Sequence, residues 1–104
     1  MKIEWTEPAL SDIDNIKEFI SKDSQYYASR FVKKIIESVE KLEQFPQIGR
    51  KVPEAEENEG DIREIIFQNY RIMYRVDPER ILILAIIHAA REISQHKPNP
   101  WDVV

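Results

Sequence analysis

Arginine and histidine side chains in the second half of the chain are the residues best suited to chemistry. Arg71 and Arg75 lie within one short run of β-forming residues, and His88 ends the next such run. Guanidinium groups bind phosphates, and a histidine can transfer a proton near neutral pH. General acid–base chemistry on a phosphate ester needs a base, an acid and fixed positive charge, so these residue types have suitable chemistry.

Whether these side chains meet depends on the faces of a sheet that they share. Residues along a strand alternate between two faces, so Arg71 and Arg75 share one face and the apolar residues between them share the other. If residues 77–80 form a hairpin loop, Arg71 lies opposite Ile86, with His88 as its diagonal neighbour. We therefore expect Arg71, Arg75 and His88 to converge on the solvent-facing side of the sheet, away from any covering helices.

The elements that must position these residues follow from hydrophobic periodicity and breaker residues. Ile3 and Trp5 point the same way in an alternating run, and Thr6 is suited to cap a helix. Two stretches with helical spacing follow, and then a loop rich in Pro, Gly and acids precedes three β-rich runs. The expected elements are a strand over 2–6, helices over 7–21 and from Asp23 or Ser24 to about 45, and strands over 62–67, 70–76 and 81–88.

This order predicts an α+β fold: an N-terminal strand, an antiparallel two-helix hairpin, and a three-stranded antiparallel meander with the helices on one face. The last strand is apolar at the positions that point to either face, so we expect it inside the sheet and covered on both faces. Residues 1–104 are expected to form a single domain with an irregular tail from about 94, in which Trp101 folds back on the body.

The amino-acid composition disfavours several classes of function. The 15 Lys and Arg against 19 Asp and Glu give a net charge of −4, which disfavours nucleic-acid binding through bulk electrostatics. Acids are concentrated between residues 54 and 61, so the acidity is largely local and the composition does not exclude a basic patch elsewhere. With no cysteine and only two histidines, we expect no metal site and no cofactor. The amino terminus lacks an apolar signal region and no run is long enough to cross a bilayer, which favours a cytoplasmic address and no membrane partner.

Several short motifs together resemble the RelE/ParE toxin superfamily. They are Trp5-Thr6 followed by Ala9 and Asp12, Phe45-Pro46-Gln47-Ile48-Gly49-Arg50 with Val52-Pro53, Ile62-Arg63-Glu64, Tyr70-Arg71-Ile72-Met73-Tyr74, and Ile87-His88-Ala89-Ala90-Arg91. The resemblance implies the toxin of a type II toxin–antitoxin system of the plasmid-stabilisation type, inhibiting growth unless its antitoxin neutralises it. One branch of the superfamily cuts messenger RNA on the ribosome, whereas ParE members poison DNA gyrase.

The ribonuclease pattern is only partly present, which favours a ParE-like action on gyrase. Arg71 and Arg91 match arginines of the ribonuclease branch, but its lysine pair is represented at most by Arg63, and its tyrosine beyond Arg91 is absent. We take Arg63, Arg71, Arg75 and Arg91 as candidate target-binding residues. In the alternative, a ribosome-dependent endonuclease, Arg71, Arg91 and His88 are catalytic. A second alternative is a non-toxic module that only binds the antitoxin.

Several of these candidate residues also have a purely structural interpretation. Arg71 and Arg75 can equally pair with carboxylates across the sheet, and His88 is better explained as a packed or hydrogen-bonded histidine than as a catalytic one. A tight turn at 68–69 puts Arg63 on the opposite face from Arg71, and a bulge would reverse this. Glu54, which resembles a loop base of another ribonuclease branch, is interpreted as a solvated charge. The aromatic residues Trp5, Tyr26 and Tyr27 are expected to serve packing.

The partner expected from the resemblance is a cognate antitoxin, with gyrase, or the ribosome and messenger RNA, as the target. No direct DNA binding by the toxin alone is expected. A two-helix layer beside a meander leaves a groove and a sheet edge, which suit an amphipathic helix or an added strand from the antitoxin. Arg71→Ala is expected to reduce toxicity while leaving the fold and antitoxin binding intact.

Overall fold

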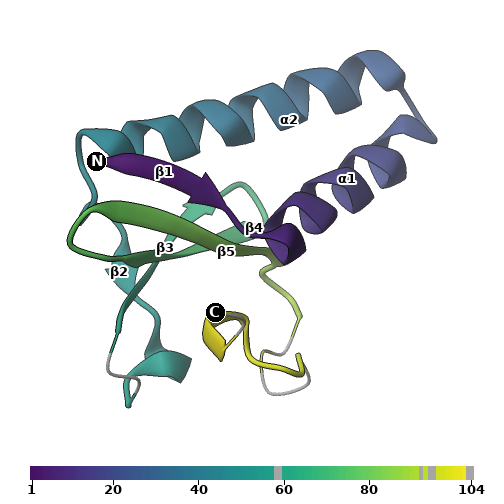
Figure 1. Ribbon diagram of the computed structural model, residues 1–104. Coiled ribbons are helices and arrows are strands. Elements are labelled where there is room, and N and C mark those ends of the chain that lie inside the picture. Colours follow the sequence, from purple (N-terminus) through teal and green to yellow (C-terminus); the bar gives the residue numbers. More distant parts are fainter. Residues whose placement is uncertain (58–59, 92, 94–95, 103–104) are drawn as a thin grey trace.

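A two-helix hairpin covers one face of a five-stranded sheet (Figure 1). The computed structural model describes residues 1–57, 60–91, 93 and 96–102. The helices are α1 (Glu7–Ser21) and α2 (Gln25–Glu40), and the strands are β1 (Lys2–Trp5), β2 (Arg50–Lys51), β3 (Asp61–Phe67), β4 (Tyr70–Val76) and β5 (Arg80–His88). Short 3-10 helices are η1 (Lys41–Glu43), η2 (Pro53–Ala55) and η4 (Pro100–Asp102).

The strands are ordered β1-β5-β4-β3-β2. The meander from β3 to β5 is antiparallel, and β1 joins it parallel to β5. The α+β class and the expected position of the last strand inside the sheet are therefore confirmed. Strand β2 was not expected, because its two residues lie in a segment that contains breaker residues and no apolar period.

Both helices begin at the residues suited to cap them. The Thr6 hydroxyl accepts a hydrogen bond from the Ala9 amide at 3.2 Å and donates one to the Ile83 carbonyl at 2.8 Å, so it also ties the start of α1 to β5. Ser24 caps α2 by accepting a hydrogen bond from the Tyr27 amide. α2 ends at Glu40 rather than near residue 45, and η1 continues the helical path.

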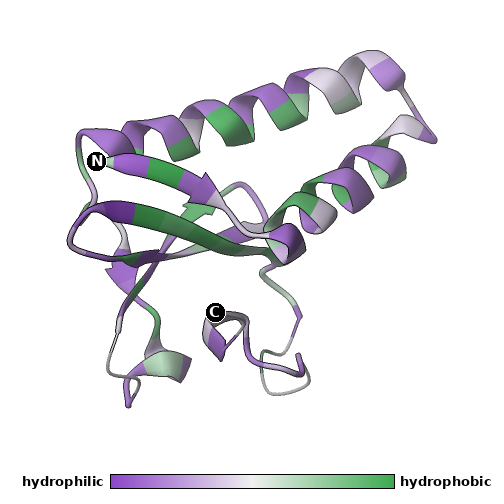
Figure 2. Ribbon diagram, in the orientation of Figure 1, coloured by the Kyte–Doolittle hydropathy of each residue, from purple (hydrophilic) through white to green (hydrophobic). Residues whose placement is uncertain are grey.

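The core between the helices and the sheet is built from residues at helical spacing on the helices and at alternate positions on the strands. Figure 2 shows hydrophobic residues on the sides of the two helices that face the sheet, and along β5. The buried residues of this cluster are Ala9, Ile13, Ile16, Phe31, Ile35, Val39, Leu42, Ile72, Tyr74, Ile81, Ile83 and Ile86. Ile3 and Trp5 pack against it, as the alternation in β1 predicts.

The opposite face of the sheet is also covered. η2 and the C-terminal segment lie on this side (Figure 1). They contribute to a second buried cluster made of Val52, Ala55, Ile62, Met73, Leu82, Leu84, Ala85, Ile87, Ile93 and Trp101. Trp101 is only 9% exposed, so the expectation that it folds back is confirmed. The expectation that this face is open to solvent is wrong. The sequence did not reveal the cover because the segments that form it have no hydrophobic periodicity.

A bulge changes the register between β4 and β5. Val76 pairs with Ile81 as a short loop predicts, but Met73 pairs with Ala85 while Tyr74 pairs with Ile83, which leaves Leu84 as the extra residue. Beyond the bulge every pair is shifted by one, so Arg71 lies opposite Ile87 instead of the expected Ile86. The bulge also moves every later residue of β5 to the other face.

The C-terminal tail begins at residues that lie outside the described part of the chain, since 94 and 95 are among those not described. Within 96–102 the only regular element is η4. None of the helices in the described residues combines the length and apolarity that a membrane span needs.

Candidate functional site

Arg71 lies at the centre of a charge network on the face of the sheet opposite the helices. Its Nε donates to Glu64 Oε1 at 2.6 Å, and its two terminal nitrogens donate to the two carboxylate oxygens of Glu54 at 3.0 and 2.8 Å. The residue is 8% exposed. A guanidinium that forms a bidentate pair with one carboxylate and a further bond to another is fully neutralised.

Glu64 holds this network together. Its side chain has no exposed surface, and its second oxygen accepts a hydrogen bond from Arg50 Nε at 2.6 Å. The strands explain the geometry: Glu64 pairs with Met73 across β3 and β4 and with Arg50 across β2 and β3, so its side chain lies between the two arginines. A buried carboxylate needs such partners, because burying an unpaired charge is costly.

Glu54 is solvent-exposed, as the acid-rich loop suggested, but it is also paired with Arg71. It lies in η2, where the 3-10 turn after Val52 directs it toward β4. The hydrogen bond from Arg71 lowers the pKa of the Glu54 carboxyl below its ordinary value. This carboxylate is therefore held in its ionised form, with each of its oxygens accepting a hydrogen bond from Arg71.

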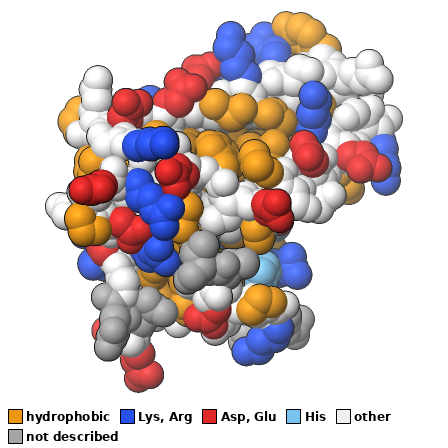
Figure 3. Space-filling model, in the orientation of Figure 1, with side chains coloured by type: hydrophobic (Ala, Val, Ile, Leu, Met, Phe, Trp, Pro, Cys, Tyr) orange, Lys and Arg blue, Asp and Glu red, His pale blue; other side chains and the backbone are white. Residues whose placement is uncertain are grey.

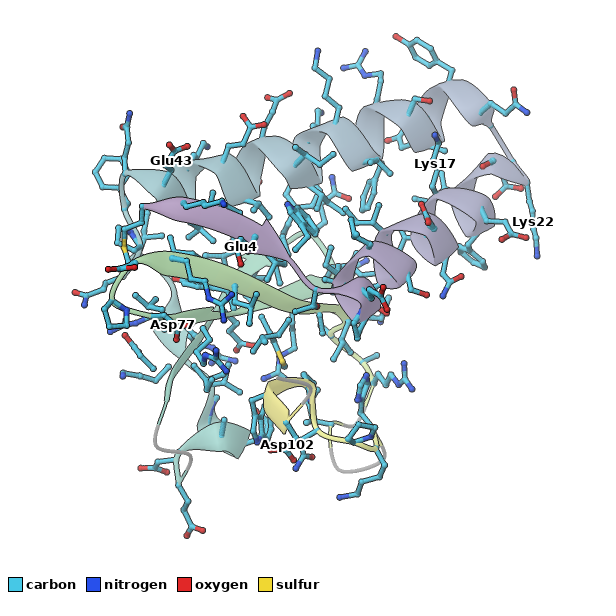
Figure 4. All side chains as sticks on the ribbon, viewed as in Figure 1. Glu4, Lys17, Lys22, Glu43, Asp77 and Asp102 are labelled. Carbon is cyan, nitrogen blue, oxygen red and sulfur yellow. The ribbon has the colours of Figure 1, made fainter. Side chains whose placement is uncertain are left out.

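Arg75 and Arg80 form a second network at the other end of β4. Arg75 donates to both carboxylate oxygens of Asp77, at 2.8 and 3.0 Å. Arg80 bridges Asp77 and Glu4, with its shorter hydrogen bond of 2.7 Å going to Glu4; both acids are labelled in Figure 4. The hydrogen bond from Arg75 lowers the pKa of Asp77. Pairing across the sheet is thus confirmed for Arg71, whereas the carboxylate partner of Arg75 is Asp77, two residues further along the chain.

Arg63 lies on the opposite face from Arg71, as the tight turn predicts. It pairs with Tyr74, which belongs to the core under the helices. Its guanidinium donates to Asp61 at 3.0 Å and to the carbonyls of Gln47 and Gly49 at 3.2 and 2.9 Å. Arg63 therefore anchors the loop before β2 to β3.

Gly49 shows why this loop passes so close to the sheet. Its amide donates to the buried Tyr74 hydroxyl at 2.9 Å. A Cβ at this position would lie 2.5 Å from both the Glu64 carbonyl oxygen and the Tyr74 hydroxyl. Only glycine fits such an approach. Burial raises the pKa of Tyr74, so the phenol remains a neutral acceptor for the amide.

His88 does not join the arginines. Because of the bulge it pairs with Tyr70, and the two rings contact each other edge to face at 5.4 Å between centroids. Tyr70 packs against the core on the helix side of the sheet, and the Ala90 amide donates to His88 Nδ1 at 3.2 Å. The expected convergence of His88 with Arg71 and Arg75 is wrong. His88 is exposed, and its ring is held by the contact with Tyr70 and the hydrogen bond from the Ala90 amide.

Arg91 lies apart from the other candidate arginines, in the exposed turn after β5. Its amide donates to the His88 carbonyl at 2.9 Å, and its charge acts on Asp12 of α1. Asp12 accepts a hydrogen bond from the Ile86 amide at 2.9 Å and so connects α1 to β5 just past the bulge. Burial raises the pKa of Asp12, and this effect outweighs the opposing influence of the amide and of the nearby cations.

The expectation that the aromatic residues serve packing is correct for only one of the three. Trp5 packs against the core as expected. Tyr26 and Tyr27 do not serve packing: they are 70% and 64% exposed, so that expectation is wrong. The spacing of four residues between Tyr27 and Phe31 is compatible with the buried stripe of α2, so the pattern alone does not reveal that Tyr27 is exposed.

The arrangement differs from what phosphate chemistry requires. The arginines of the sheet are neutralised by carboxylates, and the histidine lies on the other face from Arg71. Among the described residues, no group of three or more His, Asp or Glu side chains is placed to hold a metal ion. Sequence reasoning missed Glu64, although a charged residue between Ile62 and Ile66 on the same face of a strand was a signal for a buried ion pair.

The comparisons with known proteins agree with one another. The family model described as "ParE toxin of type II toxin-antitoxin system, parDE" matches residues 3–93. A Sinorhizobium fredii protein named "Putative toxin Y4kP" is 32% identical over 99 residues, covering 90% of this chain and 94% of that protein. A solved chain described as "Chromosomal ParDE TA system from P. aeruginosa" matches with a TM-score of 0.69 and 25% identity, covering 85% of this chain and 95% of that one. This chain belongs to the ParE toxin family of type II toxin–antitoxin systems.

Proposed function

We propose that this toxin inhibits growth by acting on DNA gyrase through protein contact, without cleaving RNA. The observation that carries the proposal is the state of Arg71, the residue that matches an arginine of the ribonuclease branch. Its guanidinium is buried and engaged with Glu64 and Glu54. A phosphate would have to displace at least one of these carboxylates before Arg71 could bind it.

The energetics disfavour such a displacement. Displacing Glu64, whose side chain has no exposed surface, costs about 3–5 kcal/mol, which the incoming phosphate would have to offset. Displacing Glu54, whose side chain is 41% exposed, costs only about 0–1 kcal/mol, but it leaves Arg71 paired with Glu64. The net charge of −4 adds a repulsive field that RNA would have to overcome. His88 is on the other face of the sheet and so cannot complete an acid–base pair with Arg71.

The direct test is supercoiling by purified gyrase from the native host. We expect inhibition that increases with toxin concentration, and unchanged supercoiling at a large excess of folded toxin would count against the proposal. Primer extension on translated messages tests the endonuclease alternative, because codon-phased cuts would appear only if the toxin cleaves RNA. Normal growth on expression of soluble toxin without antitoxin would favour the non-toxic module.

The family assigns the chain a cognate antitoxin as its partner, and we propose that part of this antitoxin adds to the sheet at β1. The sheet has two edge strands, and β2 is only two residues long, so β1 offers the longer free edge. Exposed edges recruit strands from other chains. Amide hydrogen exchange along Lys2–Trp5 should slow when the antitoxin segment binds, and unchanged exchange would contradict this placement.

A further inference from the structure

The outer side of α2 carries a group of exposed tyrosines and cations that no described segment of the chain covers. We call this group, Tyr26, Tyr27, Arg30, Lys33 and Lys34, the α2 surface. All five residues are exposed, although Ala28, Phe31 and Ile35 between them are buried. Figure 3 shows Lys and Arg side chains along the outer side of α2, with acids toward its C-terminal end.

The cations of this surface differ from those of the sheet. Each arginine of the sheet strands forms an ion pair with at least one carboxylate; these are Arg50, Arg63, Arg71, Arg75 and Arg80. Among the described residues, Arg30, Lys33 and Lys34 take part in no ion pair. The chain is acidic overall, yet these three charges remain available for a partner.

The tyrosines and cations form a shaped surface. Arg30 donates to the Tyr26 hydroxyl at 2.9 Å and lies 5.6 Å from the centroid of the same ring, so the two side chains hold each other in place. Beside them is a hollow of about 120 Å³ that reaches the β3–β4 turn and is lined by Tyr26, Tyr27, Arg30, Phe31, Lys34 and Gln68. A pre-arranged hollow lowers the entropic cost of binding.

We propose that the α2 surface is the site at which the toxin docks on an acidic surface of gyrase. The inference rests on the proposed function and names the part of the toxin that makes the contact. Exposed Tyr and Arg are the residue types that contribute most to protein interfaces, and the unpaired lysines complement acidic residues at the rim.

A protein partner explains this surface better than a nucleic acid does. A nucleic acid binds through many phosphate contacts along an extended backbone, and the net charge of −4 on the chain disfavours such binding. Glu37, one turn beyond Lys33, also lies beside the patch and would repel a continuous phosphate backbone.

The test compares two charge-reversed variants. Lys33→Glu/Lys34→Glu changes the α2 surface, and Lys17→Glu/Lys97→Glu changes the net charge equally at exposed positions elsewhere; Lys17 is labelled on α1 in Figure 4. Tyr27→Ala is a second variant that removes an exposed ring without altering charge. Circular dichroism establishes that each is folded, and calorimetry gives affinities for purified gyrase, for the antitoxin and for a DNA duplex alone.

We expect both α2 variants to bind gyrase at least about tenfold more weakly than the wild type, while the Lys17/Lys97 variant binds normally and antitoxin affinity is retained. Wild-type affinity of the α2 variants for gyrase would overturn the inference and leave the proposed function standing. It is also overturned if antitoxin binding is lost in parallel, or if the surface binds the duplex alone. Failure of the wild-type toxin to bind gyrase would refute the proposed function itself, together with this inference.

Discussion

Replacing Arg71 with alanine should destabilise the fold. Replacing a solvent-facing arginine, by contrast, would leave the stability almost unchanged. The change removes the 2.6 Å hydrogen bond to Glu64, whose side chain has no exposed surface. Removing one partner of a buried pair costs about 3–5 kcal/mol. Arg50 still neutralises the other oxygen of Glu64, so we expect the low end, about 3 kcal/mol.

The second pair of Arg71 adds little to this estimate. Glu54 is 41% exposed, and an ion pair that solvent reaches contributes about 0–1 kcal/mol. For a chain of this size, a loss of about 3 kcal/mol lowers the melting temperature by roughly 12–24 °C. Reduced toxicity of Arg71→Ala would then reflect less folded toxin, so it would not identify Arg71 as a target-binding residue.

The assay is urea unfolding followed by circular dichroism at pH 7, with two matched variants. Arg75→Ala removes an arginine from the same strand, but its partner Asp77 is half-buried, so we expect a loss within about 1 kcal/mol. Arg71→Met/Glu64→Gln removes both charges and should recover much of the stability. An unfolding free energy for Arg71→Ala equal to that of Arg75→Ala would refute the reasoning.

Three further predictions concern the segments around this network. Glu54 has a lowered pKa in the folded state, so its contribution to stability is present above its ordinary pKa of 4.5 and is lost as the pH falls through the folded value; Glu54→Gln should flatten this acid-side slope in urea titrations between pH 3 and 7. Gly49→Ala places a Cβ 2.5 Å from a backbone oxygen of β3 and should cost about 1–3 kcal/mol, whereas an unchanged melting temperature would mean that the loop can move away. Trp101→Ala should cost about 3 kcal/mol, compared with about 0.5 kcal/mol or less for the exposed Tyr26→Ala, and equal melting temperatures would show that the C-terminal segment adds no core.

The sequence predicted the regular elements because their signals are local. Thr6 and Ser24 cap the helices through their own side chains, and the apolar spacing that follows defines each buried face. Alternation placed Arg71 and Arg63 on opposite faces, and the structure agrees. These features need no knowledge of distant parts of the chain.

The errors arose where tertiary contacts decide. β5 is apolar on both faces, so its sequence pattern does not show where the bulge lies. The extra residue Leu84 moves His88 to the helix side of the sheet. The segments that cover this face of the sheet come from η2 and the C-terminal region, where no hydrophobic periodicity predicts packing. The pairing of Glu54 with Arg71 was missed for the same reason, since only the fold brings the two residues together.

The most direct test of the account is a supercoiling reaction with purified native-host gyrase, in which toxin is titrated alone and after saturation with its antitoxin. We predict that free toxin inhibits supercoiling in proportion to its concentration, that the antitoxin-saturated toxin does not, and that the toxin produces no cuts in translated messages. Full supercoiling at a large excess of folded toxin, together with codon-phased cleavage of messenger RNA, would contradict it.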